Sequence, residues 1–183
     1  METAATLPVV LVLASGRGER FVASGGRGSK LQALLAGRTV LDHTLAAVRA
    51  SGLPFHVEDA GHPGMGDSIA AGVRATADAA GWLVLPGDLP LVTPQSLRAV
   101  AAALERASII VPFHRGTRGH PVAFGAVYGP LLRGLTGAEG AAAIVRSGQP
   151  LKLELEDEGI VMDIDTVDDL ARAEALLLRR RAS

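Results

Sequence analysis

Residues 8–14 of this chain, Pro-Val-Val-Leu-Val-Leu-Ala, form a continuous apolar run that leads directly into a loop rich in glycine and arginine. The run is too short to span a membrane, and it lacks the polar alternation of a half-exposed strand. Strands without alternation are typical of parallel sheets, because helices cover both faces of such a sheet. The run therefore predicts a buried strand of a parallel sheet, with the glycine-rich loop at its carboxyl end.

Strand-like and helix-like segments alternate along the rest of the chain. We expect further strands at 55–58, 82–85, 108–113, 151–155 and 160–164, and helices at 40–50, 68–79, 94–106, 131–146 (in two pieces) and 166–179. Thr39, Thr93 and the pair Thr166 and Asp169 are the expected helix caps, and 15–29 and 114–120 are expected loops. This alternation predicts a three-layer, Rossmann-like α/β fold with a mostly parallel sheet. The length of 183 residues favours a single domain over 1–183.

The composition excludes several classes of site. The chain has no cysteine, which excludes disulfides, iron–sulfur clusters and cysteine-based zinc sites. Aromatic residues make up 3% of the chain and the formal net charge is −1, so neither a base-stacking platform nor a large basic surface for nucleic acid is expected. The histidines have no metal-binding spacing. With no signal-peptide pattern and no membrane-spanning run, we expect a cytoplasmic protein with no nucleic-acid or membrane partner.

The loop after the first strand has the features of a phosphate-binding loop. Gly16 and Gly18 would expose backbone N–H groups, and Arg20 and Lys30 would add positive charge. The loop does not have the pattern of a Walker A motif or of a complete dinucleotide fingerprint. An ordinary turn with solvated arginines is the alternative interpretation.

Three carboxylates follow strand-like segments. Asp88 comes directly after the apolar run at 82–85, while Asp163 and Asp165 end the segment expected as a strand at 160–164. Alternation along a strand would place Asp163 and Asp165 on one face, where a cation relieves their repulsion. The pattern predicts a Mg²⁺ site that bridges nucleotide phosphates; helix capping and solvated strand ends are the alternatives.

Six segments in this order resemble the signature of the MobA-like nucleotidyltransferases, and in particular the branch of molybdenum cofactor cytidylyltransferases. The segments are 13–21 with Lys30 (L-A-S-G-R-G-E-R-F…K), 64–68 (G-M-G-D-S), 87–90 (G-D-L-P), 118–122 (R-G-H-P-V), 137–141 (G-A-E-G-A) and 163–170 (D-I-D-T-V-D-D-L). The resemblance implies a fold of the nucleotide-diphospho-sugar-transferase type.

The resemblance also implies a role for each segment. The nucleotide-binding residues would be Leu13, Ala14, Ser15, Gly16, Arg17, Gly18, Lys30, Gly64, Met65, Gly66 and Ser68. The catalytic residues would be Arg20, Lys30 and Asp88, of which Arg20 and Lys30 neutralise phosphates. Asp88 and Asp165, with Asp163 close by, would hold Mg²⁺. The second substrate, a phosphate-bearing pterin, would face Arg118, Gly119, His120 and Pro121.

The sequence departs from the family pattern at four places. Ser15 stands where cytidylyltransferases have alanine and guanylyltransferases have glycine, which favours cytosine. The insert at 22–29 is expected to move Lys30 away from the loop, and the short stretch at 50–63 is expected to lack part of a strand–helix unit at the sheet edge. Glu139 is displaced by one position from the acidic residue of the family pattern.

The resemblance thus predicts a Mg²⁺-dependent CTP:molybdenum cofactor cytidylyltransferase. The pterin phosphate would attack the α-phosphorus of CTP and release pyrophosphate, and the enzyme would contact a molybdoenzyme or its chaperone transiently. Two alternatives stay open. One is a nucleotidyltransferase for another nucleoside triphosphate or another phosphorylated acceptor, and the other is a non-catalytic protein that binds nucleotide or molybdenum cofactor.

Overall fold

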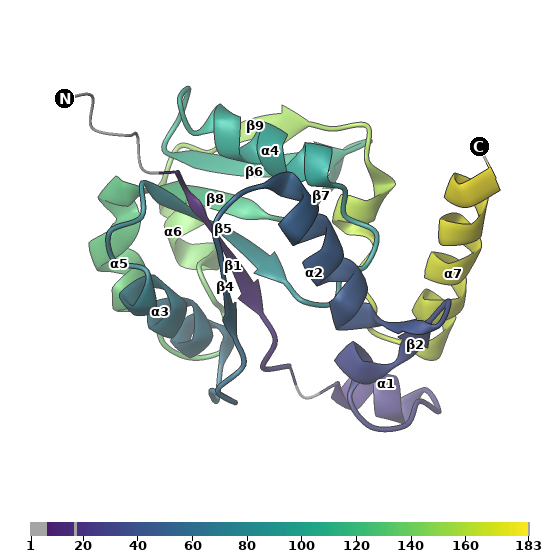
Figure 1. The fold of residues 1–183 in the computed structure, drawn as a ribbon. Helices are drawn as coiled ribbons and strands as arrows, with labels where there is room; N and C mark the ends of the chain where they lie inside the picture. The colour runs from purple at the N-terminus through teal and green to yellow at the C-terminus, as the bar shows by residue number, and fades with distance from the viewer. Residues whose placement is uncertain (1–6, 17, 183) are drawn as a thin grey trace.

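The computed structural model of the protein describes residues 7–16 and 18–182 (Figure 1). The strands are β1 (Val9–Leu13), β2 (Leu34–Leu35), β3 (Arg38–Thr39), β4 (Phe55–Glu58), β5 (Gly81–Pro86), β6 (Ile109–His114), β7 (Thr117–Arg118), β8 (Val122–Gly125) and β9 (Leu151–Glu154). The α-helices are α1 (Glu19–Ala23), α2 (Val40–Ser51), α3 (Met65–Ala75), α4 (Pro94–Ala103), α5 (Gly129–Arg133), α6 (Ala142–Ser147) and α7 (Val167–Ala182). Short 3₁₀ helices cover Lys30–Gln32, Ala126–Tyr128 and Glu158–Val161.

One twisted sheet organises the fold. Its strand order is β4-β1-β5-β8-β6-β7, and β9 pairs with β6. The pairs β4–β1, β1–β5 and β6–β9 are parallel, whereas β8 is antiparallel to both β5 and β6. Strands β1, β4, β5, β6 and β9 therefore run in one direction, and β7 and β8 run against them. The mostly parallel sheet predicted from the sequence is confirmed.

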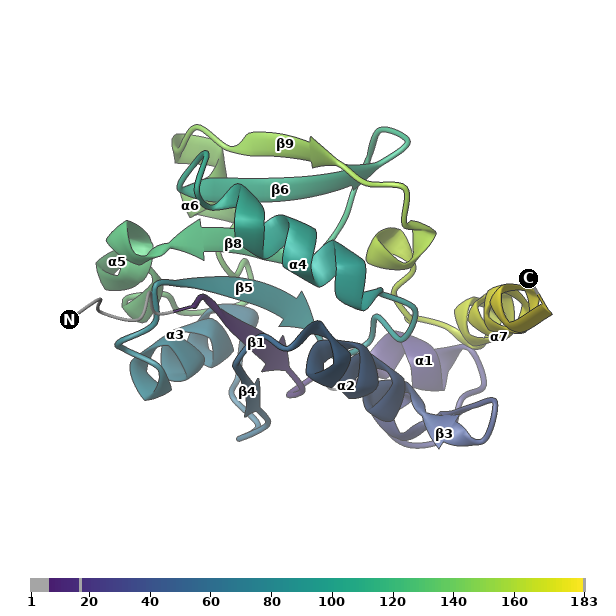
Figure 2. The same cartoon turned by 45° about the horizontal axis from the view of Figure 1, so that its top comes forward.

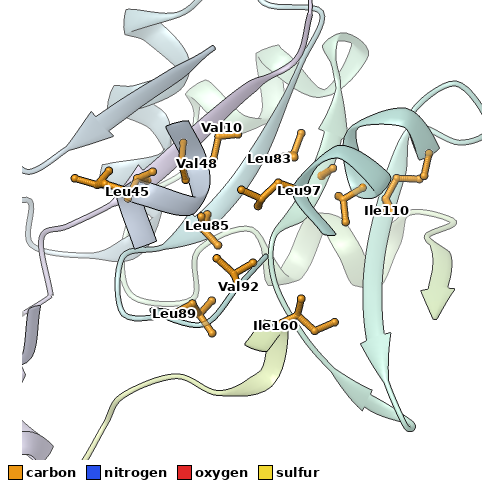
Figure 3. Close-up of a cluster of buried hydrophobic side chains, with 14 residues drawn as sticks. Val10, Leu45, Val48, Leu83, Leu85, Leu89, Val92, Leu97, Ile110 and Ile160 are labelled. Carbon is orange, nitrogen blue, oxygen red and sulfur yellow. The ribbon is translucent and has the colours of Figure 1, made fainter. Parts of the chain in front are cut away.

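Helices cover both faces of this sheet, as Figures 1 and 2 show. On one face, α2 and α4 pack through Leu45, Val48, Leu97 and Val100 onto a cluster of buried strand residues that includes Leu85 (Figure 3). On the other face, α3, α5 and α6 pack against alternate residues of the same strands. Because side chains alternate between the faces of a strand, a fully apolar strand supplies both clusters. The three-layer arrangement is confirmed.

A third apolar cluster lies at the edge where the parallel strands end. It joins Phe21 of α1 and Leu31 to Ala173 and Leu176 of α7, which lies beyond the sheet next to α1 (Figure 2). Ile164, which is fully buried, belongs to this cluster as well. The packing brings the C-terminal part of the chain back to the loop that follows β1.

The predicted helix caps are confirmed. The Thr39 and Thr93 side chains accept hydrogen bonds from Asp42 N and Ser96 N at the starts of α2 and α4. Asp169 N donates to Thr166 Oγ1 at 3.2 Å, and Thr166 N donates to Asp169 Oδ2 at 2.8 Å. This reciprocal pair is the capping box predicted before α7.

Three sequence-based predictions of secondary structure are wrong. Residues 160–164 are not a strand: Ile160 lies in a 3₁₀ helix and Ile164 in an irregular segment, and each is buried in a different apolar cluster. Their apolar alternation reflects this burial and not a sheet. The loops expected at 15–29 and 114–120 contain α1 and β7, respectively.

Three further strands, β2, β3 and β8, were not predicted from the sequence, and β8 lies between β5 and β6. At one end of the strand order, β4 is the outermost strand of the sheet, and residues 59–64 lead from it directly into α3. Within residues 7–16 and 18–182, no helix has the length and apolar character needed to cross a membrane.

Candidate active site

A pocket of about 410 Å³ opens where β1 and β5 end. The two strands are parallel neighbours, and Gly87 N donates to Leu13 O at 2.9 Å just beyond their last paired residues. Ligand sites of open parallel sheets lie at this edge. The pocket is lined by Leu13, Ser15, Gly16, Glu19, Lys30, Leu31, His62, Pro63, Gly64, Met65, Ser68, Pro86, Gly87, Asp88 and Ala138.

Most residues predicted to bind nucleotide are in this lining, but three described ones are not. Ala14 and Gly66 are not among the lining residues, and Gly18 lines a smaller adjoining pocket of about 280 Å³ together with Arg20 and Asp165. Arg17 lies outside the residues that the structure describes. The sequence did not predict a pocket-lining role for Glu19, Leu31, His62, Pro63, Pro86 or Ala138.

The loop after β1 folds back onto Lys30. Gly18 has φ 63°, and a side-chain Cβ at this position would lie 3.3 Å from Lys30 N. The side chain of Lys30 passes Gly16, whose Cβ position is 4.0 Å from Lys30 Cε. The expectation that the insert at 22–29 moves Lys30 away from the loop is therefore wrong. The insert forms the end of α1 and a turn, and the chain then returns to the loop.

Lys30 is the centre of the charged part of the site. Its Nζ lies 2.5 Å from Asp88 Oδ2 and 2.8 Å from Asp165 Oδ1, and all three side chains are largely buried. Arg20 adds a contact from the exposed side, with its guanidinium 2.8 Å from Asp165 Oδ2. Burial alone would lower the pKa of Lys30, but the two carboxylates outweigh it and hold this pKa above its usual value. Lys30 is therefore a fixed positive charge.

The three predicted metal-binding carboxylates are together. Asp88, Asp163 and Asp165 each have an oxygen within 4.8 Å of the others. Burial and the charges of Asp88 and Asp165 raise the pKa of Asp163. Asp88 Oδ1 is buried and has no hydrogen-bond partner among the described residues. A buried carboxylate oxygen without a donor, on a residue clustered with two further carboxylates, fits a divalent cation of the Mg²⁺ or Mn²⁺ type.

Backbone hydrogen bonds hold the acidic residues in place without the strand that was predicted. Ile164 N donates to Asp88 O at 3.0 Å, which ties the two acidic segments together. Asp169 Oδ2 accepts from Asp165 N at 3.1 Å as well as from Thr166 N. The proximity of Asp163 and Asp165 to Asp88 was predicted correctly, but an irregular segment provides it.

The second glycine-rich segment supplies Gly64, Met65 and Ser68 to the pocket lining. A Cβ on Gly64 would lie 2.4 Å from Gly137 O, and one on Gly66 would lie 2.6 Å from Thr136 O. Gly66 N donates to Gly137 O at 2.8 Å, so this N–H group holds the loop before α6 and does not face the pocket. Ser68 Oγ donates to Gly64 O at 3.2 Å. These glycines bring Met65 and Ala138 to the same wall.

The predicted acceptor residues Arg118, Gly119, His120 and Pro121 do not line this pocket. Gly119 is packed against Ile160 O, and His120 N donates to the same carbonyl at 2.9 Å. Burial and the neighbouring Arg118 lower the pKa of His120 to about 4, against an opposing effect of Asp88. His120 is therefore neutral at physiological pH and lies within the electrostatic reach of Asp88, while Arg118 is exposed. Glu139 lies away from the pocket lining and pairs with Arg146 at 3.2 Å.

The chain matches known proteins in sequence and in fold. Residues 45–153 match the family model of the MobA-like NTP transferase domain. Purine catabolism protein PucB of Bacillus subtilis (strain 168) is 31% identical over 153 residues, which cover 70% of this chain and 74% of PucB. The matched family region contains Gly64, Asp88 and Arg118.

Solved structures share the fold at lower identity. Rv0371c of Mycobacterium tuberculosis H37Rv superimposes with a TM-score of 0.76 at 24% identity, over 94% of this chain and 100% of that one. Its complex with manganese gives a TM-score of 0.70 at 23% identity, over 93% and 99%. Molybdopterin-guanine dinucleotide biosynthesis protein A of Archaeoglobus fulgidus gives a TM-score of 0.69 at 20% identity, over 93% of this chain and 99% of that one. The family match covers more than half of the 183 residues. The chain therefore belongs to the MobA-like NTP transferase family.

Proposed function

We propose that this chain is a Mg²⁺-dependent cytidylyltransferase that transfers CMP from CTP to the phosphate of a molybdenum cofactor pterin. The observation that carries the proposal is the position of Lys30, held by Asp88 and Asp165 at the rim of the pocket. A fixed cation between carboxylates at the end of parallel strands suits a triphosphate that arrives with its own divalent cation.

In the proposed reaction, an oxygen of the acceptor phosphate forms a bond to the α-phosphorus of CTP. The bond between that phosphorus and the bridging oxygen of the β-phosphate breaks, and pyrophosphate leaves. Backbone N–H groups of the loop at Gly16 and Gly18 would bind phosphate oxygens. Lys30 and Arg20 would stabilise the negative charge that shifts onto the leaving pyrophosphate. Catalysis would thus rest on alignment and charge, with no covalent enzyme intermediate.

The carboxylates of Asp88, Asp163 and Asp165 are the residues that would hold Mg²⁺. When bound, the cation would neutralise phosphate oxygens and polarise the reacting phosphorus. Asp88 contributes the buried oxygen that lacks a hydrogen-bond donor. Asp169 and the bond from Ile164 N to Asp88 O would keep this oxygen and those of the 163–165 segment at a constant spacing.

The test is pyrophosphate release by the purified chain with Mg²⁺, CTP and molybdenum cofactor. Asp88→Asn keeps the shape of the side chain and should reduce turnover about 100-fold or more, since it removes a charge at the reacting centre. Asp78→Asn, at an exposed position after α3, is the matched control and should leave turnover unchanged. Normal turnover of Asp88→Asn would refute the metal assignment, and absence of turnover in the unaltered chain would refute the cytidylyltransferase assignment.

A second candidate is a nucleotidyltransferase with another phosphorylated acceptor. It is supported by the position of Arg118, Gly119, His120 and Pro121, because none of these residues predicted to face the pterin lines the described pocket. A panel of acceptors with each of the four nucleoside triphosphates distinguishes the candidates. Pyrophosphate release with a sugar phosphate but not with molybdenum cofactor would favour the second.

A further inference from the structure

Two histidines and one glutamate form a hydrogen-bonded cluster beside the pocket, at the end of β4. Glu58 is buried, with 7% of its surface exposed. His62 Nε2 lies 3.0 Å from Glu58 Oε1, and His56 Nε2 lies 3.2 Å from Glu58 Oε2. Burial alone would raise the pKa of Glu58, but the two histidines and Ala60 N outweigh it and lower this pKa. Glu58 is therefore a carboxylate, which only accepts hydrogen bonds.

The carboxylate determines which nitrogen of His62 carries hydrogen. A ring nitrogen that faces a carboxylate must donate, so Nε2 is the protonated nitrogen of the neutral ring. In the neutral form of the ring, Nδ1 is then left with a lone pair, and it is the ring nitrogen not committed to Glu58. His62 lines the pocket, so the chain places a histidine of defined tautomer in the candidate site.

The same glutamate also holds the start of the loop that follows β1. Its backbone carbonyl accepts from Ala14 N at 2.9 Å and from Ser15 Oγ at 3.2 Å. The hydroxyl hydrogen of Ser15 is thus used within the protein, and that of Ser68 is donated to Gly64 O. The side chains of Ser15 and Ser68, and that of His62 in its neutral form, therefore offer only acceptor atoms to a ligand in the pocket.

We propose that His62, oriented by Glu58, reads the nucleobase by accepting a hydrogen bond from the exocyclic amine at position 4 of cytosine. The inference rests on the proposed function, since it assumes that a nucleoside triphosphate occupies this pocket with its phosphates toward Lys30. UTP is the informative competitor, because it has a carbonyl acceptor in place of that amine. Two acceptors that face each other repel and leave polar atoms unsatisfied. In this proposal His62, and not Ser15, is the residue that selects cytosine.

The experiment compares CTP, UTP and 2′-deoxy-CTP by calorimetry on the full chain with Mg²⁺. The unaltered chain should bind CTP at least about 10-fold more tightly than UTP, the effect of one matched against one mismatched hydrogen bond. His62→Phe keeps a flat ring without nitrogens and should bring this ratio to within about 3-fold. His114→Gln is the control, because His114 binds Leu155 O away from the pocket, and it should leave the ratio unchanged.

Glu58→Gln tests the positioning role of the glutamate. Its amide can donate as well as accept, so it no longer requires hydrogen on Nε2 of His62, and the CTP:UTP ratio should fall. Nitrogen NMR of the imidazole ring reports the tautomer directly: His62 of the unaltered chain should show the Nε2–H form, and Glu58→Gln should lose this preference. A merely structural role for Glu58 would change thermal stability but not the tautomer or the ratio.

Three results would overturn the inference. A CTP:UTP ratio that His62→Phe leaves unchanged would remove His62 as the base-reading residue while the proposed function stands. If His62→Phe weakens the binding of CTP and UTP equally and changes the preference for CTP over 2′-deoxy-CTP, His62 is assigned to the ribose instead. If no nucleoside triphosphate binds to the unaltered chain with Mg²⁺, the proposed function fails and the inference fails with it.

Discussion

Lys30 Nζ lies 2.5 Å from Asp88 Oδ2, which joins the loop after β1 to the end of β5 by a largely buried ion pair. The same nitrogen contacts Asp165 Oδ1 at 2.8 Å. Two of the three carboxylates that fit a divalent cation are therefore paired with the same lysine. An ammonium and a divalent cation compete for the charge of the same carboxylates, and this competition can be measured.

Lys30→Met should raise the affinity of the nucleotide-free chain for Mn²⁺ about tenfold, because the competing charge is removed while the stem of the side chain is kept. Electron paramagnetic resonance of free Mn²⁺ provides the measurement. The same variant should lose nucleotidyl transfer about 100-fold or more, since the phosphates lose a cation. Lys152→Met, on β9, is the matched control. Unchanged or weaker Mn²⁺ binding by Lys30→Met would contradict the competition.

Asp169→Ala should weaken Mn²⁺ binding although Asp169 is not one of the three clustered carboxylates. Asp169 Oδ2 accepts hydrogen bonds from Asp165 N, Thr166 N and Thr166 Oγ1, so its loss frees the segment that carries Asp165. We expect a loss of about 1–2 kcal/mol in the free energy of unfolding, as for other helix caps. Chemical denaturation and Mn²⁺ titration measure the two effects. Asp169→Asn keeps an acceptor oxygen and should restore most of both.

Asp157→Ala should lower the free energy of unfolding by about 2–3 kcal/mol, because a buried carboxylate with several donors is removed. Thr93 N, Ser96 Oγ and Gly159 N donate to Asp157, and Arg180 pairs with it at 2.9 Å. These contacts fasten α7 and the segment after β9 to the start of α4. Urea denaturation measures the loss, and Asp168→Ala, at an exposed position in α7, is the control.

The difference between the unaltered chain and Asp157→Ala should depend on pH. Burial alone would raise the pKa of Asp157, but hydrogen bonds from Ser96, Thr93 and Gly159 lower it below the usual 3.8. A carboxyl with a lower pKa in the folded chain stabilises the fold above its unfolded-state pKa, and this stabilisation is lost as the pH falls through the folded-state value. The difference should therefore be complete near about pH 6 and should decrease below about pH 4. A difference that grows on acidification would contradict this assignment.

Gly66→Ala should reduce CTP affinity and thermal stability together. Its Cβ would lie 2.6 Å from Thr136 O and 2.8 Å from Thr136 C, so backbone and not a flexible side chain would have to move. Overpacking of this kind costs about 1–3 kcal/mol. The displacement would separate Met65 and Ser68 from Ala138 on the pocket wall. Gly134→Ala meets only ordinary contacts at 3.6 Å and should be neutral in calorimetry and thermal melting.

The sequence by itself was sufficient for the two parallel strands, β1 and β5, that position the site. The apolar run at 8–14 and the buried segments at 82–85 and 108–113 can only be covered by helices on both faces, and the structure has them so. Because parallel strands end at one edge, Asp88 and the loop at Gly16 were predicted to be neighbours, and both line the pocket. The helix caps were also readable, since a cap depends on residues three positions apart.

The tertiary structure decided which distant residues meet. Ile160 and Ile164 alternate like strand residues, yet each fills a different apolar cluster, and local periodicity does not reveal which cluster a side chain enters. Lys30 was expected away from the loop, but burial of Leu31 beneath α1 and α7 returns it to Asp88. The pairing of His62 with Glu58 depends on where β4 ends beside β1 and on the turn that follows it. Periodicity and capping act over a few residues, whereas the burial of Ile160 and Ile164 and the contact of Lys30 with Asp88 depend on packing between segments far apart in the chain, and only the folded arrangement determines them.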